Sequence, residues 1–420
     1  MRWKDVQPRG GHKIYIIGLC LLFSVAFLPA DLIGQGKRSG EALEPQLMSK
    51  SAVLYDLETG TLLFSKAPDI SIPPASMTKL MTLHLVYKAF DEGRITPDTI
   101  VTIDENEDFR NLPRRSSLMF LEAGQHVSVR ELMRGLAVPS GNDAALVLAR
   151  LVSDTVETFV EEMNREVNAL GLQGIHFSDP AGLSEDNKVT AREFGKFCMH
   201  YIRSHPDSLE DLHNLESFTY PSEEAAENGE PVSFGPVTQN NYNVLIGRHP
   251  WVDGLKTGYI DESGYNIALT ARADGRRLVA VLLGGPGESP MEGSLTRAID
   301  GVNLISYGFY AYRRVMPAIE PIGPLRVWKG DVSHVDITVP PMAPLILPAE
   351  DAGSVQYRYD IDLPLIAPLS AEEEIGEVVI VNGEEVLAKY PLFPGMNVEA
   401  GGWLRRLIDA VRLFFQEIFI

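Results

Sequence analysis

Three short motifs contain the residue types needed to make a serine hydroxyl attack a carbonyl: Ser76-Met77-Thr78-Lys79, Ser140-Gly141-Asn142 and Lys256-Thr257-Gly258. A serine hydroxyl is a poor nucleophile at neutral pH, so it needs a base within hydrogen-bond reach and donors aimed at the oxyanion it generates. The three motifs together supply these parts. They predict a serine that becomes acylated.

The segment that carries Ser76 follows Pro73-Pro74 and runs into an apolar stretch, which predicts the start of a helix. Positions i and i+3 share one face of a helix, so Lys79 should lie beside Ser76 and accept its proton. Only the neutral amine can do so, and its pKa must therefore fall from about 10.4 toward 7, roughly 4 to 5 kcal/mol of differential stabilisation. Burial and a second cation would lower this pKa, and Lys256 is the candidate cation.

An α+β domain over residues 46–314 should position these motifs, because strands and helices are segregated along the chain. β-Hairpins are predicted at 52–64 and at 265–283, the second turning near Asp274-Gly275. The Lys-Thr-Gly motif precedes the second hairpin and should form an edge strand of the same antiparallel sheet. Helices are expected over 130–151, 155–170 and 294–312.

The composition indicates globular material, since 45% of the 420 residues are hydrophobic and 22% are charged. This length allows a large core and a second domain. The formal net charge of −20 argues against nucleic acid as a partner and against broad electrostatic attraction to anionic lipid. No metal or other cofactor is expected.

The first 36 residues have the layout of a secretory signal, with basic residues, an apolar run from Ile14 to Leu28 and small residues after it. The run is short for a membrane span, which needs about 20 apolar residues, although an uncleaved anchor is the alternative. Residues 37–45 should be a linker. Removal of the signal would leave Cys198 as the only cysteine, so no intramolecular disulfide is expected. The predicted location is the extracytoplasmic or periplasmic face of the cytoplasmic membrane.

After Pro317 apolar and polar residues alternate, which predicts a small β-sandwich domain over 315–395. Residues 396–420 should form a membrane anchor. Within it, the apolar residues of 403–420 fall on one half of a helical wheel and the charged residues on the other. Such a helix is expected to lie in a membrane interface and not to cross it, although docking on the protein's own surface is the alternative.

Taken together, these features resemble one family, the low-molecular-mass penicillin-binding proteins of the D-alanyl-D-alanine carboxypeptidase type. The three motifs stand in the order typical of penicillin-binding proteins and class A β-lactamases. Four longer segments also resemble sequences of this family, namely Pro73 to Lys79, Asn168 to Leu172, Val252 to Gly258 and Gly264 to Asn266. The resemblance spans nearly the full length. It implies a β-lactamase/transpeptidase-like serine domain, an all-β domain and a C-terminal anchor.

The resemblance also implies roles for single residues. Ser76 would attack the carbonyl between the two terminal D-alanines of a peptidoglycan stem peptide, with Lys79 as its base. Ser140, assisted by Lys256, would relay a proton to the departing D-alanine. The remaining groups would bind the substrate. Asn142 would bind its peptide backbone, and Thr257 and Arg297 would bind its terminal carboxylate. The backbone N–H groups of Ser76 and Tyr259 would stabilise the oxyanion. β-Lactam antibiotics such as penicillins would acylate Ser76 and stall there.

Some of these residues also have simpler interpretations. Ser140 and Asn142 could cap the helix that follows them. Thr257 could be an ordinary edge-strand residue, and Arg297 a solvated charge on the closing helix. Tyr259 departs from the family pattern, because many carboxypeptidases have His there, and this bears on substrate fit or on the fate of the acyl-enzyme.

Two other functions stay open at this point. A serine β-lactamase shares the motifs but needs a carboxylate that activates the deacylating water, usually in a Glu-x-x-Leu-Asn phrase, and no such phrase occurs between Ser140 and Lys256. The other is an envelope scaffold or β-lactam sensor that no longer turns over substrate. Tyr259 and the large β-rich domain motivate that alternative.

Overall fold

A computed structural model describes residues 44–222, 233 and 235–418. The expected signal and nearly all of the expected linker lie outside the described residues. The apolar side chains form two cores in the first part of the described chain and a third core in the β-rich part. The fold class is therefore the predicted one, a mixed helix and sheet domain followed by an all-β domain.

The predicted antiparallel sheet has five strands in the order β2-β1-β9-β8-β7. Both predicted hairpins are confirmed: β1 (Ser51–Asp56) pairs with β2 (Leu62–Lys66), and β8 (Gly264–Ala273) pairs with β9 (Arg276–Gly285). The Lys-Thr-Gly motif lies on β7 (Val252–Ile260), which is an edge strand as predicted. An edge position leaves one side of this strand available to a substrate.

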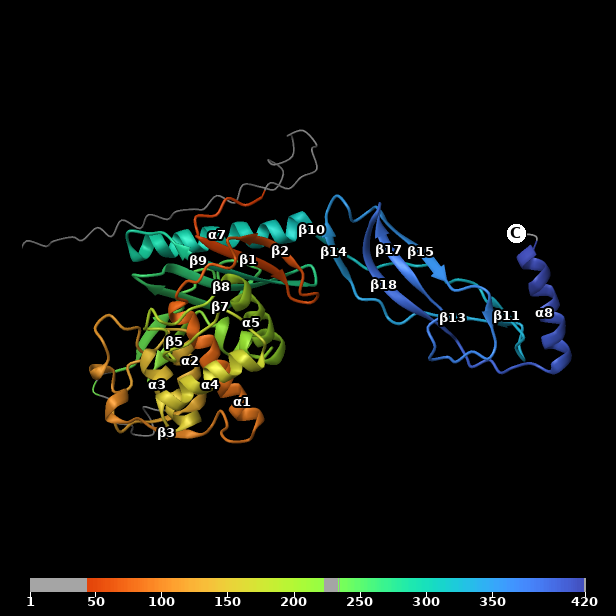
Figure 1. Cartoon of the computed structure of the whole chain (residues 1–420). Coiled ribbons are helices and arrows are strands. Elements are labelled where there is room, and N and C mark those ends of the chain that lie inside the picture. Colours follow the sequence, from red (N-terminus) through yellow and green to blue (C-terminus); the bar gives the residue numbers. More distant parts are fainter. Residues whose placement is uncertain (1–43, 223–232, 234, 419–420) are drawn as a thin grey trace, which may run out of the picture. The chain divides into compact units, whose positions relative to one another are not determined.

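The sheet is buried on both faces, because alternate residues of each strand enter two different cores. Along β9, Val279 and Val281 belong to the core shared with the helical region, whereas Ala280 and Leu282 pack with residues of α7 (Pro290–Ala311). Figure 1 shows α7 along one face of the sheet and α5 (Ala191–Ser204) with the other helices beneath the opposite face. The central strands are accordingly rich in buried apolar residues.

The helical region matches the prediction except at one break. The range 130–151 holds two helices, α2 (Val129–Ala137) and α3 (Asn142–Ser153), because the chain turns sharply at Ser140, which has a φ of +61°. α4 (Val156–Ala169) lies within the second predicted range. Shorter elements complete this domain: β3 (Ile100–Thr102), 3-10 turns Glu105–Glu107 and Phe109–Asn111, β4 (His126–Ser128), the turn Leu209–His213, β5 (Ser217–Tyr220) and β6 (Val237–Asn240).

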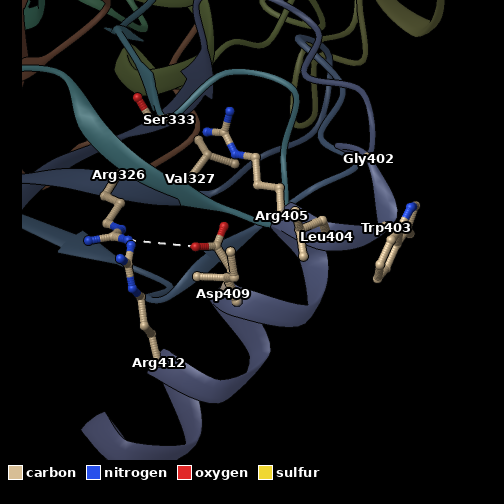
Figure 2. A pocket seen from close by; sticks show the side chains of 10 residues that line it. Arg326, Val327, Ser333, Gly402, Trp403, Leu404, Arg405, Asp409 and Arg412 are labelled. Carbon is tan, nitrogen blue, oxygen red and sulfur yellow. Dashed lines mark ion pairs between the residues drawn. The ribbon is translucent and has the colours of Figure 1, made fainter.

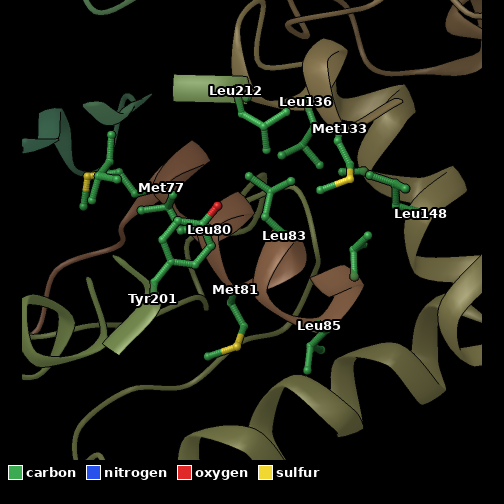
Figure 3. Close-up of a cluster of buried hydrophobic side chains, with 14 of the residues drawn as sticks. Met77, Leu80, Met81, Leu83, Leu85, Met133, Leu136, Leu148, Tyr201 and Leu212 are labelled. Atoms are coloured by element: carbon green, nitrogen blue, oxygen red, sulfur yellow. The ribbon is translucent and has the colours of Figure 1, made fainter. Parts of the chain in front are cut away.

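The helix that carries the serine motif lies at the centre of the largest core. A 3-10 turn, Ala75–Thr78, leads into α1 (Lys79–Asp91), and every residue from Met77 to Val86 is buried. Figure 3 shows side chains of α1 pointing outward in several directions into apolar side chains of the surrounding elements. A helix that is buried all round is held from every side, so the start of α1 is a rigid position for a nucleophile.

The β-rich part has its own core, formed around Val327, Leu365, Val378, Ile380 and Leu392. Its sheets have the orders β10-β14, β12-β11-β16 and β13-β18-β17-β15. The strands are β10 (Tyr312–Val315), β11 (Leu325–Trp328), β12 (His334–Val335), β13 (Ile337–Thr338), β14 (Leu345–Pro348), β15 (Val355–Ile361), β16 (Leu365–Ile366), β17 (Gly376–Asn382) and β18 (Glu385–Pro394). The terminal helix α8 (Trp403–Ile418) follows, close to its predicted range.

Candidate active site

The structure brings Ser76 and Lys79 together as the helical spacing predicted. Lys79 Nζ lies 3.0 Å from Ser76 Oγ and also donates to Asn142 Oδ1 at 2.7 Å and to the carbonyl oxygen of Ala181 at 2.6 Å. Ser76 is only half-buried, whereas Lys79 is completely buried. The hydroxyl is thus within reach of a ligand while its neighbouring amine is shielded from water.

Burial lowers the pKa of Lys79 to about 7. The nearby carboxylates Asp179 and Asp143 act in the opposite direction, but desolvation of the ammonium outweighs them. The sequence argument also invoked Lys256 as a second cation. In the structure the main cause is burial, and the pKa of Lys256 is itself lowered by burial and by the charges of Lys79 and Arg297.

The Ser140-Gly141-Asn142 motif lies where the turn after α2 leads into α3, and Asn142 is the first residue of α3. Gly141 is the N-cap residue of α3 and no side chain caps this helix, so the capping interpretation of Ser140 and Asn142 is wrong. Asn142 instead holds the Lys79 amine through its amide oxygen. The Ser140 hydroxyl is buried and finds no hydrogen-bond partner among the described residues, which leaves it free to exchange a proton with a bound substrate.

The edge strand β7 packs directly against the turn that carries Ser76. A side chain at Gly258 would come within 2.3 Å of the Pro74 carbonyl oxygen and 3.2 Å of the Ser76 nitrogen, so only glycine permits this approach. Gly182, with a φ of +81°, closes the same turn from the other side, where a Cβ would lie 2.0 Å from the Ala75 carbonyl oxygen. Two glycines therefore fix the backbone around the nucleophile.

The other residues of the Lys-Thr-Gly motif are buried beside this contact. Lys256 and Thr257 are almost fully buried, and Lys256 Nζ reaches the Thr257 carbonyl oxygen at 3.4 Å. An ordinary lysine on an edge strand would extend into solvent. The burial of Lys256 instead places its amine inside the candidate active site. The proposed contacts of Thr257 with a substrate stay a prediction.

Arg297 reaches the site from α7 and is not the solvated charge that was the alternative. Its side chain is buried, and burial lowers its pKa to about 10. The guanidinium donates to the carbonyl oxygens of Gly258 at 3.4 Å and Tyr242 at 3.2 Å, and lies 5.8 Å above the ring of Tyr265. A positive charge is thus held behind the end of β7.

Tyr259 stands at the outer end of the motif with an exposed ring. This ring packs on Tyr265 with centroids 4.4 Å apart, and its hydroxyl donates to Asp261 Oδ1 at 2.6 Å. The bond to Asp261 raises the pKa of Tyr259 to about 12, so the phenol stays protonated at neutral pH. The side chain forms an aromatic rim, while the backbone N–H remains the predicted oxyanion donor.

Two carboxylates that the sequence argument missed hold the surroundings of Lys79. Asp143 accepts hydrogen bonds from the backbone N–H groups of Met119, Phe120, Leu121 and Ala144. Asp179 accepts from Ala181, Gly182, Leu183 and Ser184, and so shapes the loop whose Ala181 carbonyl binds the amine. The Asp-Pro-Ala-Gly spacing at 179–182 predicts a turn, but not that the turn meets α1.

Comparison with known proteins agrees with the serine and lysine site that the geometry shows. Residues 38–287 match the peptidase S11 family, described as D-alanyl-D-alanine carboxypeptidase. Residues 310–400 match the C-terminal domain of penicillin-binding protein 5. The two matches cover most of the serine domain and the β-rich domain, and residues 288–309, which include most of α7, lie between them.

Individual relatives resemble the chain over most of their length. The D-alanyl-D-alanine carboxypeptidase DacA of Haemophilus influenzae is 33% identical, covering 89% of this chain and 91% of the relative. DacD of Escherichia coli K12 is 32% identical, covering 87% and 90%. The crystal structure of penicillin-binding protein 5 from H. influenzae has a TM-score of 0.70 at 31% identity and covers 85% of this chain and 99% of that one.

Proposed function

This chain belongs to the D-alanyl-D-alanine carboxypeptidase family of serine peptidases, and we propose that it removes the terminal D-alanine from peptidoglycan stem pentapeptides through an acyl-enzyme on Ser76. The observation that carries this proposal is the fully buried Lys79 amine, 3.0 Å from the Ser76 hydroxyl. Its pKa of about 7 leaves a substantial neutral fraction at physiological pH. Such an amine is a suitable general base.

The reaction follows from the positions of the side chains. Ser76 Oγ bonds to the carbonyl carbon between the two D-alanines, and its proton passes to Lys79. The C–N bond then breaks, and Ser140 passes its proton to the nitrogen of the departing D-alanine while it takes up the proton held by Lys79, which returns Lys79 to the neutral amine. Water afterwards cleaves the ester and releases the shortened peptide.

The basic side chains of Lys256 on β7 and Arg297 on α7 favour a substrate that ends in a carboxylate. Lys256 and Arg297 are both buried, and each has a pKa lowered by burial. A terminal carboxylate offers a partner for cations that water does not solvate, and Arg can bind it through two N–H groups. β-Lactams carry a carboxylate in a similar place and should acylate Ser76. A similar structure supports this expectation. Penicillin-binding protein D2 from Listeria monocytogenes was solved in a cefotaxime-bound form; it has a TM-score of 0.54 at 26% identity and covers 64% of this chain.

The hydrogen bonds accepted by the carboxylates near Lys79 argue against a serine β-lactamase. Asp143 and Asp179 are the two whose charges act on Lys79, and each accepts several backbone N–H bonds. A carboxylate engaged in this way holds a loop and is poorly placed to activate water. The non-turnover scaffold is disfavoured because the Ser76 and Lys79 geometry is intact.

Release of D-alanine from a stem-pentapeptide mimic tests the proposal, with Ser76→Ala as the control. We expect release by the native chain, none by the variant, and a stable penicillin adduct seen by intact-mass measurement only when Ser76 is present. Rapid penicillin hydrolysis would instead favour a β-lactamase. An adduct that persists in the variant would contradict the whole mechanism.

We further propose that the protein is exported and attached to the membrane surface by α8. The support is the signal-like sequence of residues 1–36 and the exposed apolar side chains of the helix, which are Trp403, Leu404, Leu407, Ile408, Val411, Phe414 and Phe415. No helix in the described part of the chain is long and apolar enough to cross a membrane. Together these features suit a helix lying in the interface.

Cell fractionation and vesicle sedimentation test this second proposal. The chain with Leu407→Ser and Phe414→Ser should lose sedimentation with phospholipid vesicles, because two exposed apolar contacts are removed. N-terminal sequencing of the exported protein shows whether residues 1–36 are cleaved. Unchanged sedimentation of the double variant would contradict attachment through α8.

A further inference from the structure

A pocket of about 730 Å³ lies between α8 and strand β11 (Figure 2). Three arginines line it, Arg326 from β11 and Arg405 and Arg412 from α8, together with the carboxylate Asp409. Three guanidinium groups and one carboxylate leave an excess of two positive charges. This local excess is notable because the whole chain carries a formal net charge of −20.

Two of the arginines, Arg326 and Arg405, are held in place by neighbouring groups. Asp409 is buried, accepts a hydrogen bond from the Lys329 backbone N–H at 2.8 Å, and lies 3.7 Å from Arg326. The Arg326 guanidinium stacks 3.7 Å from the centre of the Trp328 ring, and Arg405 donates to the Asp331 carbonyl oxygen at 2.9 Å. Each guanidinium has five N–H donors, so these contacts leave donors for an anion.

The pocket has an apolar wall as well as a cationic one. Leu404 and Ile408 line it and belong to the exposed apolar face of α8. The arginines therefore lie at the border of the face that we propose enters the membrane interface. At that border a membrane presents phosphate groups next to acyl chains.

We propose that this pocket binds the phosphate of an anionic phospholipid, with the start of its acyl chains against Leu404 and Ile408. The inference rests on the proposed attachment of α8 to a membrane. Guanidinium groups bind phosphate through charge-assisted, bidentate hydrogen bonds, which are shorter and stronger than neutral ones. A chain with a strongly negative net charge gains from such a short-range contact, because long-range attraction to an anionic surface is absent.

Calorimetric titration of the full chain with dihexanoylphosphatidylglycerol below its micelle concentration tests the pocket without requiring a membrane. We expect saturable binding that weakens about fivefold in Arg326→Gln and in Arg412→Gln, the effect of one arginine near an anionic lipid. The matched control is Arg406→Gln, because Arg406 is exposed on the same helix and does not line the pocket. That control should change binding less than about twofold.

Inorganic phosphate is the second probe, and it should bind at least about tenfold more weakly because it cannot use the apolar wall. Equal affinity for phosphate and lipid would overturn the lipid assignment in favour of a free-anion site. Absence of saturable lipid binding, or equal weakening by Arg406→Gln, would overturn the pocket itself. Binding of the monomeric lipid without sedimentation on phosphatidylglycerol vesicles would contradict membrane attachment and leave the pocket intact.

Discussion

Helices α1 and α8 each place a charged side chain in a buried position, yet the two regions use it differently. On α1, Lys79 is enclosed by apolar side chains and three hydrogen-bond acceptors. Burial disfavours its charged ammonium relative to the neutral amine. On α8, within residues 403–415, only a narrow strip around Asp409 is buried and the other side chains are largely exposed. Burial within an apolar core lowers the pKa of Lys79, whereas the buried Asp409 holds α8 in place through its hydrogen bond and its ion pair.

The largest effect should come from removing the buried amine. Lys79→Met keeps the volume and apolar contacts of the side chain but deletes the base, so acylation of Ser76 by penicillin should slow by about 10²- to 10⁴-fold. Rapid-mixing mass measurement gives the rate, and the thermal unfolding temperature shows that the variant is folded. Acylation at the native rate would mean that another group takes the proton.

The pH dependence of the reaction follows from the pKa of Lys79, which burial lowers to about 7. The neutral amine is the active form, so kcat/KM for D-alanine release should be constant above this pKa. Below it the value should fall about tenfold for each pH unit. A profile measured between pH 5 and 11 checks this, and an inflection near pH 10 would show that Lys79 is not desolvated in solution.

A buried histidine pair on the α1 side should make the serine domain sensitive to acid. His84 Nδ1 lies 2.9 Å from His205 Nε2, and burial lowers the pKa of His205 from 6.5 to about 3. Its pKa is lowered on folding, so the unfolded chain binds more protons between these values and stability falls as the pH drops below about 6.5. His205 alone should contribute a decrease of about 2 kcal/mol in the free energy of unfolding between pH 7.5 and 5, and the other buried histidines with a lowered pKa, such as His213, add to it.

Urea denaturation of the full chain at the two pH values measures this change. His205→Gln should reduce the difference, because the side chain can no longer take a proton. Residues 403–420 contain no histidine, so α8 itself should not respond in this range. An equal loss of stability in the variant would assign the effect to other groups.

The smallest effect on catalysis should come from loosening α8. Asp409→Ala removes the acceptor for the Lys329 N–H and the partner of Arg326, which should destabilise docking of the helix by about 1 to 3 kcal/mol. Hydrogen exchange of the α8 amides should become faster while the rate of penicillin acylation stays unchanged. A change in acylation would show that the two regions are coupled.

Prediction from the sequence succeeded where the signal is local. The i and i+3 spacing of Ser76 and Lys79, the two hairpins and the edge position of β7 all depend on neighbours in the chain. It was less successful where distant segments meet. Ala181, which binds the Lys79 amine, lies 102 residues away from it, and no periodicity indicates this contact.

The amino-acid sequence alone determined which groups are available, a serine, two lysines and an amphipathic terminal helix, because residue type and short spacing decide local chemistry. Only the tertiary structure decided their protonation and accessibility. The same lysine would be charged on an exposed helix, and Arg297 would be a solvated cation on an isolated α7. The physical reason is that desolvation depends on all surrounding atoms, most of which come from segments distant in the chain.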